Sequence, residues 1–111
     1  MEFKEVIEDR YSCKHFKEEP VAEPALNAIL EAGRVAPTAK NLQEQHTYVV
    51  QSPEKLALID ELTPCRYGAP TVLVVLAARD NTNRVYDGSC VMSNLMNAAK
   101  AVGLASCWVH R

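Results

Sequence analysis

The chain has 111 residues, of which 48% are hydrophobic and 23% are charged, and its formal net charge is −2. These values are typical of one globular domain, which we expect to span residues 1–111, and they exclude a general electrostatic attraction to nucleic acid or anionic membranes. The N-terminus has no signal-peptide pattern, and the longest apolar run, residues 72–78, is too short to cross a membrane. We therefore expect a soluble, cytoplasmic protein.

The N-terminal half predicts two helices followed by a strand. The first helix ends near Arg10 and is marked by apolar residues at helical spacing: Phe3, Val6 and Ile7. A second helix starts near Pro24, which suits a first helical turn, and ends before Pro37. One face of this helix carries an apolar stripe with a glycine that allows a close neighbour: Leu26, Ile29, Leu30 and Gly33. Residues 46–51 are β-branched or aromatic in large part and predict a strand.

The C-terminal half predicts helix, strand, helix and strand. Ser52 and Pro53 are a typical N-cap and N1 pair, and they open a helix with three inward residues: Leu56, Ile59 and Leu62. Residues 71–78 form a continuous apolar run, typical of a strand buried on both faces. Residues 86–102 predict a helix with Asp87 at its N-cap and Gly103 in left-handed conformation after its end. Residues 105–109 predict a short last strand.

The predicted helix at 86–102 is apolar nearly all round, so the rest of the protein must cover it. Alternating helices and strands predict a sheet with helices on both faces. Three strands in so short a chain leave much of this helix without a cover. We therefore expect another subunit or a further C-terminal part to cover it. We expect a dimer that forms through this helix, and Leu95→Asp to bury an unpaired charge.

The four cysteines are scattered, without a CxxC pair, so we expect free thiols. Cys13 and His15, or Cys107 and His110, are near enough in sequence to be considered as metal ligands. In a strand, however, His110 would lie on the opposite face from Cys107. We therefore predict no metal site.

Arg10, Ser12 and Lys14 alternate in the segment after the first helix. In an extended backbone alternate side chains point the same way, so a guanidinium, a hydroxyl and an ammonium group would share one face. Such a face fits a phosphate with a polar chain attached to it. The alternative interpretation is a solvated basic patch.

Residues 37–43, PTAKNLQ, form a polar segment after the second helix. Its small and amide side chains can contact a flat heteroaromatic ring and its carbonyls; the alternative is an ordinary loop. The sequence has no glycine-rich phosphate loop and no GxGxxG motif, which argues against a P-loop or a Rossmann site. Ser89, Ser93 and the histidines form no recognisable pair of nucleophile and base.

Four segments, in order, resemble the FMN-dependent nitroreductase family: RYSCKHF with EEPV, ILEAGRVAPTAKNLQEQHTYVV, GAPTVLVV and DGSCVMSNLMNAAKAVGLASCW. They extend from about Phe3 to Trp108. The resemblance implies an α/β (α+β) fold, a nitroreductase-like three-layer sandwich whose central sheet has helices on both faces. The family continues beyond the position of Arg111, so the resemblance also implies that the family's C-terminal portion is lacking here.

The resemblance further implies a cofactor, a partner and a site. In the family, an Arg-x-Ser-x-Arg/Lys segment binds the phosphate and ribityl chain of FMN. A second segment, Ala-Pro-Ser/Thr-x-x-Asn-x-Gln, reaches the flavin of the other subunit in a homodimer. On this chain the first segment is Arg10, Ser12 and Lys14, and the second is Pro37, Thr38, Ala39, Asn41 and Gln43. The family usually has aromatic residues or a histidine after the glutamine, whereas here Glu44 and Gln45 precede His46.

By this resemblance, NAD(P)H reduces FMN by hydride transfer to N5, and the reduced flavin then reduces a nitroaromatic, quinone or similar acceptor. The redox chemistry belongs to the cofactor, so no side chain is expected to act as a catalytic acid or base. The alternative, from a different class, is a non-catalytic protein that binds a flavin or small anion, or a scaffold dimer that has lost turnover. Visible flavin absorbance of the purified protein supports the first function, and a colourless protein that cannot be reconstituted supports the second.

Overall fold

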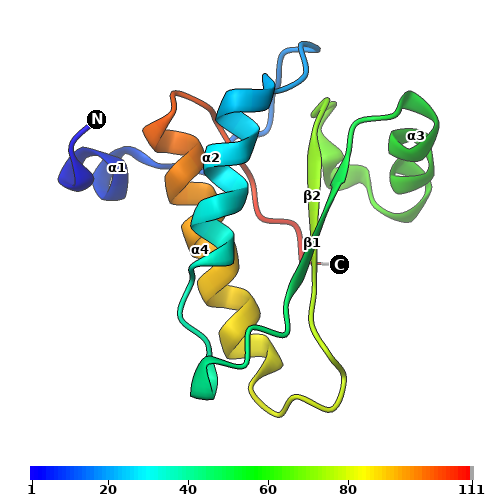
Figure 1. The fold of residues 1–111 in the computed structure, drawn as a ribbon. Helices are drawn as coiled ribbons and strands as arrows, with labels where there is room; N and C mark the ends of the chain where they lie inside the picture. Colours follow the sequence, from blue (N-terminus) through cyan, green and yellow to red (C-terminus); the bar gives the residue numbers. More distant parts are fainter. Residues whose placement is uncertain (111) are drawn as a thin grey trace.

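The computed structural model describes residues 1–110 as a helical layer beside a two-stranded sheet. The helices are α1 (Phe3–Asp9), α2 (Glu23–Arg34), α3 (Pro53–Leu62) and α4 (Arg84–Ala101). The strands are β1 (His46–Val50) and β2 (Val72–Leu76), and two short 3-10 turns are η1 (Ala39–Asn41) and η2 (Pro64–Arg66). Figure 1 shows α2 beside α4 on one side of the sheet and α3 on the other side. This is the mixed α and β arrangement that the sequence predicts.

Both ends of α2 and the C-terminal end of α4 lie where local sequence signals place them. Pro24 occupies the first turn of α2, and this helix ends at Arg34, before Pro37. At the end of α4, Gly103 is left-handed with φ 82°, and its N–H donates to the Lys100 carbonyl at 3.0 Å. The Leu104 N–H donates to the Ala99 carbonyl at 2.8 Å, which completes a Schellman motif. The prediction for Gly103 is confirmed.

The core lies mainly between α2 and α4. Its buried members are Ile29, Ala36, Val91, Leu95 and Ala99, with Leu73 and Val75 of β2 packed against them. Gly33 lets the two helices approach closely, since a Cβ atom built on it would lie 2.6 Å from Leu95 Cδ2. The side-chain amide of Asn94 also donates to the Ala32 carbonyl at 2.9 Å, which ties α4 to α2. The predicted role of Gly33 is thus confirmed.

Two glycine-to-alanine substitutions are expected to have opposite effects. Both Gly33 and Gly88 lie inside helices, so alanine adds about 1 kcal/mol of helix propensity at either position. At Gly88 nothing lies within 4 Å of the new Cβ, and Gly88→Ala is expected to be stabilising. At Gly33 overpacking costs about 1–3 kcal/mol. Urea unfolding followed by circular dichroism should find Gly33→Ala less stable than Gly88→Ala by that amount; equal stabilities would contradict the close packing.

The sheet differs from the prediction in two respects. β1 and β2 pair antiparallel, with His46 opposite Leu76 and Val50 opposite Val72. Residues 105–109 do not form the predicted strand, since within the described chain their pairing is a single parallel bridge between Ser12 and Ser106. β2 is therefore half-buried rather than buried on both faces: within residues 1–110 it pairs with β1 alone, and the helix that packs against it is α4. A strand needs continuous pairing with a neighbour, which hydrophobic sequence alone does not supply.

Three predictions about the helices are wrong: the N-cap of α4, the inward position of Leu62, and the burial of the apolar face of α1. The N-cap of α4 is Asn83, and Asp87 is a buried residue of its first turns. Leu62, predicted to point inward, is 82% exposed at the end of α3. Leu95, by contrast, is buried against Gly33 in the core of one chain, so the prediction that Leu95→Asp buries a charge agrees with the structure. Of the expected core of the first helix only Val6 is buried, while Phe3 and Ile7 are exposed.

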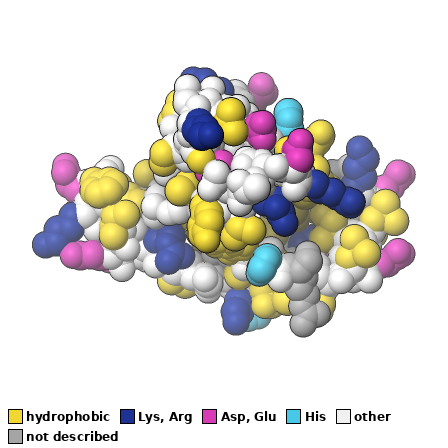
Figure 2. Space-filling view, turned by 90° about the horizontal axis from the view of Figure 1, so that it is seen from below, with side chains coloured by type: hydrophobic (Ala, Val, Ile, Leu, Met, Phe, Trp, Pro, Cys, Tyr) yellow, Lys and Arg dark blue, Asp and Glu magenta, His cyan; other side chains and the backbone are white. Residues whose placement is uncertain are grey.

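The chain exposes more surface than a compact protein of its size. Its accessible area is 7807 Å² for a mass of 12.3 kDa, whereas a compact monomer of that mass exposes about 6,100 Å². Exposed apolar side chains include Val85 and Tyr86 at the start of α4. Figure 2 shows hydrophobic side chains between charged ones on the face seen from below. The excess of about 1,700 Å² on one chain exceeds the roughly 800 Å² that each partner buries in a standard interface and is in the range of the larger obligate interfaces.

Candidate functional site

The first candidate segment, residues 10–14, is extended backbone tied to the end of the described chain. The Cys13 N–H donates to the Ser106 carbonyl at 2.9 Å, beside the bridge between Ser12 and Ser106. Cys13 is buried, whereas Ser12 and Lys14 on either side of it are exposed. Tyr11 and His15 are exposed as well, so burial does not alternate along the whole segment. The Ser12 hydroxyl and the Lys14 ammonium group are accessible to a ligand.

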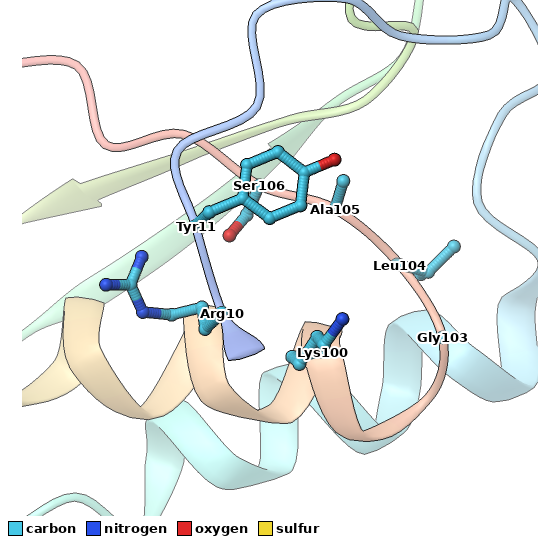
Figure 3. Close-up of a pocket in the computed structure, with 7 residues that line it drawn as sticks. All are labelled: Arg10, Tyr11, Lys100, Gly103, Leu104, Ala105 and Ser106. Atoms are coloured by element: carbon cyan, nitrogen blue, oxygen red, sulfur yellow. The ribbon is translucent and has the colours of Figure 1, made fainter. Parts of the chain in front are cut away.

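Arg10 lines a small cavity at the C-terminal end of α4 (Figure 3). The cavity has a volume of about 190 Å³ and is bounded by these residues: Arg10, Tyr11, Lys100, Gly103, Leu104, Ala105 and Ser106. In Figure 3, Arg10 and Lys100 lie on the α4 side of the cavity and the Tyr11 ring lies beside the segment that contains Ser106. Two basic residues from different elements therefore line one hollow, although in Figure 3 the Arg10 guanidinium and the Lys100 ammonium group point in different directions.

Lys14 lies apart from this cavity, near η2. Its Nζ is 5.9 Å from the centre of the Tyr67 ring, within the range of a cation–π contact. A side-chain hydrogen bond with Cys65 raises the pKa of the Tyr67 hydroxyl above its ordinary value, with burial as a second cause. The three alternating residues thus form a row rather than one compact cluster.

The second candidate segment, residues 37–43, has an unusual backbone. Lys40, Asn41 and Gln43 all have positive φ values, of 56°, 55° and 53°. Residues other than glycine rarely adopt this left-handed backbone conformation, which costs about 1 kcal/mol or more for each residue. Two backbone hydrogen bonds close the turn, from Asn41 N–H to the Thr38 carbonyl and from Leu42 N–H to the Ala39 carbonyl. Two further bonds use side chains: Ala39 N–H donates to Asp87 Oδ1 at 2.9 Å, and Gln43 N–H donates to Thr38 Oγ1 at 3.1 Å.

A second, larger cavity of about 370 Å³ lies beside this segment. Thr38 and Gln43 line it together with apolar residues of α2 and α4, among them Leu30 and Val91. Gln45 also lines it, and both polar atoms of the Gln45 side chain are buried without a hydrogen-bond partner. Burying an amide without hydrogen-bond partners costs free energy, so a ligand in this cavity that bonds to the Gln45 side chain would be favoured. Pro37 and Asn41 are exposed.

The two segments lie at opposite ends of α4. Arg10 shares its cavity with Lys100, near the C-terminal end of the helix, whereas Ala39 is bonded to Asp87 near its start. Lys100 follows Asp87 by 13 residues, which corresponds to about 20 Å along a helix axis. Within one chain, therefore, the structure does not bring Arg10, Ser12 and Lys14 together with the residues of segment 37–43.

The described residues hold no group of three or more His, Cys, Asp or Glu side chains placed to bind a metal ion. The pairs Cys13 with His15 and Cys107 with His110 thus have no further ligand nearby among residues 1–110. None of the described helices has the length and apolar character needed to cross a membrane.

Comparison with known proteins identifies the chain. A model of the nitroreductase family matches residues 7–67, which is more than half of the sequence. The chain belongs to the nitroreductase family. The resemblance stated from its four sequence segments is therefore confirmed, and the match covers both candidate segments.

Solved structures of this nitroreductase family share the fold. A nitroreductase from Bacteroides fragilis with bound FMN has a TM-score of 0.92 and 28% identity, and covers 98% of this chain and 70% of its own. A nitroreductase family protein from Clostridium difficile has a TM-score of 0.87 and 30% identity, with 99% and 69% covered. A protein from Methanothermobacter thermautotrophicus, whose name pairs NADH dehydrogenase with NAD(P)H nitroreductase, is 28% identical over 97% of this chain. The chain spans 60% of the length of that relative.

Three residues of this nitroreductase-family chain border the candidate site but were not predicted from its sequence. Lys100 joins Arg10 at the first cavity, Gln45 lines the second cavity, and Asp87 bonds segment 37–43. Only Lys100 had a local signal, because it lies one turn before the helix-ending Gly103. Asp87 matches the common pattern of an acidic residue at the start of a helix, so the sequence gives no sign of its hydrogen bond with Ala39.

Proposed function

We propose that this chain binds FMN and acts as an oxidoreductase of the nitroreductase type, which passes electrons from NAD(P)H to nitroaromatic, quinone or similar acceptors. The observation that carries the proposal is the pair of cations, Arg10 and Lys100, at one small cavity beside the exposed Ser12 hydroxyl. The relative with bound FMN supports the choice of cofactor, since it shares the fold over 98% of this chain.

The available groups fit the chemistry of FMN. A dianionic phosphate is matched by the guanidinium of Arg10 and the ammonium of Lys100, and Ser12 is a hydroxyl donor for the polar ribityl chain. Lys14, next along the row, adds a further cation. Segment 37–43 offers the exposed amides of Asn41 and Gln43 to the carbonyls and ring nitrogens of a flavin, with Pro37, Thr38 and Ala39 as small neighbours.

In this proposal the side chains bind and orient the cofactor. When bound, FMN supplies the hydride transfer that links NAD(P)H to an acceptor. Arg10, Ser12, Lys14 and Lys100 hold the phosphate and ribityl end, and segment 37–43 meets the ring. No side chain of these segments needs to gain or lose a proton. We propose as well that residues 1–111 form one domain, because α2, α4 and β2 share a single core.

We also propose that two chains build each site. The two segments of one chain are about 20 Å apart along α4, so the segment 37–43 that meets a flavin is supplied by a second copy. The excess exposed surface and the apolar residues Val85 and Tyr86 support such a homodimer.

The proposal is tested by titrating the purified chain with FMN and then following NADH oxidation with a quinone and with a nitroaromatic acceptor. We expect flavin absorbance that stays with the protein, sedimentation as a dimer, and NADH oxidation that depends on the acceptor. A colourless chain that cannot be reconstituted would contradict the proposal and favour a scaffold. Retained flavin without NADH oxidation would favour a binding protein, and a well-folded monomer at micromolar concentration would contradict the two-chain site.

A further inference from the structure

We propose that Asp87 is a positioning residue that holds segment 37–43 in the conformation in which it meets the flavin. The inference rests on the proposed FMN function and goes beyond it, since Asp87 belongs to neither segment carried over from the family motifs. Asp87 lies on α4, and its partner Ala39 is 48 residues earlier in the sequence.

The Asp87 carboxylate is the centre of a buried network. Asp87 is 4% exposed, and its two oxygens accept from different donors: Oδ1 from Ala39 N–H at 2.9 Å, and Oδ2 from the Asn81 side-chain amide at 3.3 Å. Asn81 is itself 6% exposed, and its Oδ1 accepts from Asn83 N–H at 2.8 Å. The network thus joins segment 37–43, the loop before α4 and α4 itself.

Segment 37–43 needs such an anchor because its own backbone is unfavourable. Three of its residues, Lys40, Asn41 and Gln43, are left-handed without being glycine. Asp87 holds the segment at Ala39, immediately before these residues, and Thr38 Oγ1 holds it again at Gln43 N–H. The two bonds enclose Asn41, one of the two exposed amides proposed to meet the flavin. Without the Asp87 bond the segment can relax into other conformations, and the ring loses its fixed contact.

The network requires a carboxylate at position 87. Both neighbours present N–H donors, so both oxygens at this position must accept. Asparagine has nearly the same shape but turns one acceptor into a donor, which then faces another donor. Rotating the Asn81 amide would not remove the clash between the two donors. The Asn81 oxygen accepts from Asn83 N–H, so rotation would place the Asn81 NH₂ group against that donor instead. Exchanging the two residues, Asp87→Asn together with Asn81→Asp, restores a donor and acceptor for every bond.

The experiment compares the parent chain with Asp87→Asn, Asn81→Asp and the exchanged double variant. Amide hydrogen exchange is measured without flavin at Ala39 and, as an internal reference, in the middle of α4. FMN affinity is then measured by titration. Asp87→Asn is expected to speed exchange at Ala39 by about 10- to 100-fold, the effect of losing a charge-assisted hydrogen bond. Its FMN dissociation constant should rise about tenfold, and the double variant should bring both values back to within about threefold of the parent.

The outcomes separate this inference from the proposed function. Unchanged exchange at Ala39 in Asp87→Asn overturns the anchor, whatever the flavin does. Faster exchange with unchanged FMN affinity overturns the role toward the flavin. A uniform rise in exchange throughout α4 that the double variant does not reverse also overturns it, since that is general destabilisation. A parent chain that binds no FMN overturns the proposed function, whereas the exchange result still decides the anchor.

Discussion

Leu95→Asp is expected to leave the chain largely unfolded at 25 °C. Leu95 is 5% exposed in the core between α2 and α4, where it lies against Gly33. Aspartate there would either bury a charge without a partner or protonate, and it would also lose the apolar packing of leucine. Each route costs several kcal/mol, which is comparable to the whole stability of a small domain, about 5–15 kcal/mol.

The matched control is Leu58→Asp, the same substitution on α3 at a side chain that is 58% exposed. Surface substitutions of this kind change stability by about 0.5 kcal/mol or less. Urea unfolding followed by circular dichroism should find a cooperative transition for Leu58→Asp and little or none for Leu95→Asp. Similar transitions for the two variants would show that Leu95 is not in the core of the folded chain.

Arg10→Ala is expected to weaken FMN binding by about 1.5–3 kcal/mol, the range for a hydrogen bond to a charged group. This corresponds to about 10- to 150-fold in the dissociation constant. Arg10 is half-buried at the cavity that it shares with Lys100, so its guanidinium is partly withdrawn from water and is less screened than a surface charge. Titration with FMN at fixed ionic strength, followed by flavin fluorescence, measures the change.

The control for lost positive charge is Lys55→Ala, on the exposed face of α3 across the sheet from α4. It removes one cation and should change the affinity by less than about twofold, because distant surface charges are screened by salt. Arg34 is a poorer control, since its guanidinium is paired with Glu31 at 2.7 and 2.6 Å and borders the second cavity. Equal losses in Arg10→Ala and Lys55→Ala would mean that FMN responds only to net charge.

The sequence by itself predicted the elements whose causes are local. α2 follows from Pro24, its apolar stripe and Pro37, and the end of α4 follows from Gly103. Capping and helical periodicity involve residues only a few positions apart, so the pattern and its cause are visible together.

Only the tertiary structure decided which distant residues meet. The apolar residues 105–109 do not form the predicted strand because their pairing within residues 1–110 is one bridge to Ser12. Leu95 faces the core rather than a partner because Gly33, 62 residues earlier, opens a space for it. Asp87 was predicted as an N-cap, yet its carboxylate bonds the Ala39 amide instead. The apolar or charged character of a side chain determines what kind of contact it requires. The packing of α2, α4 and segment 37–43 determines which residue supplies that contact.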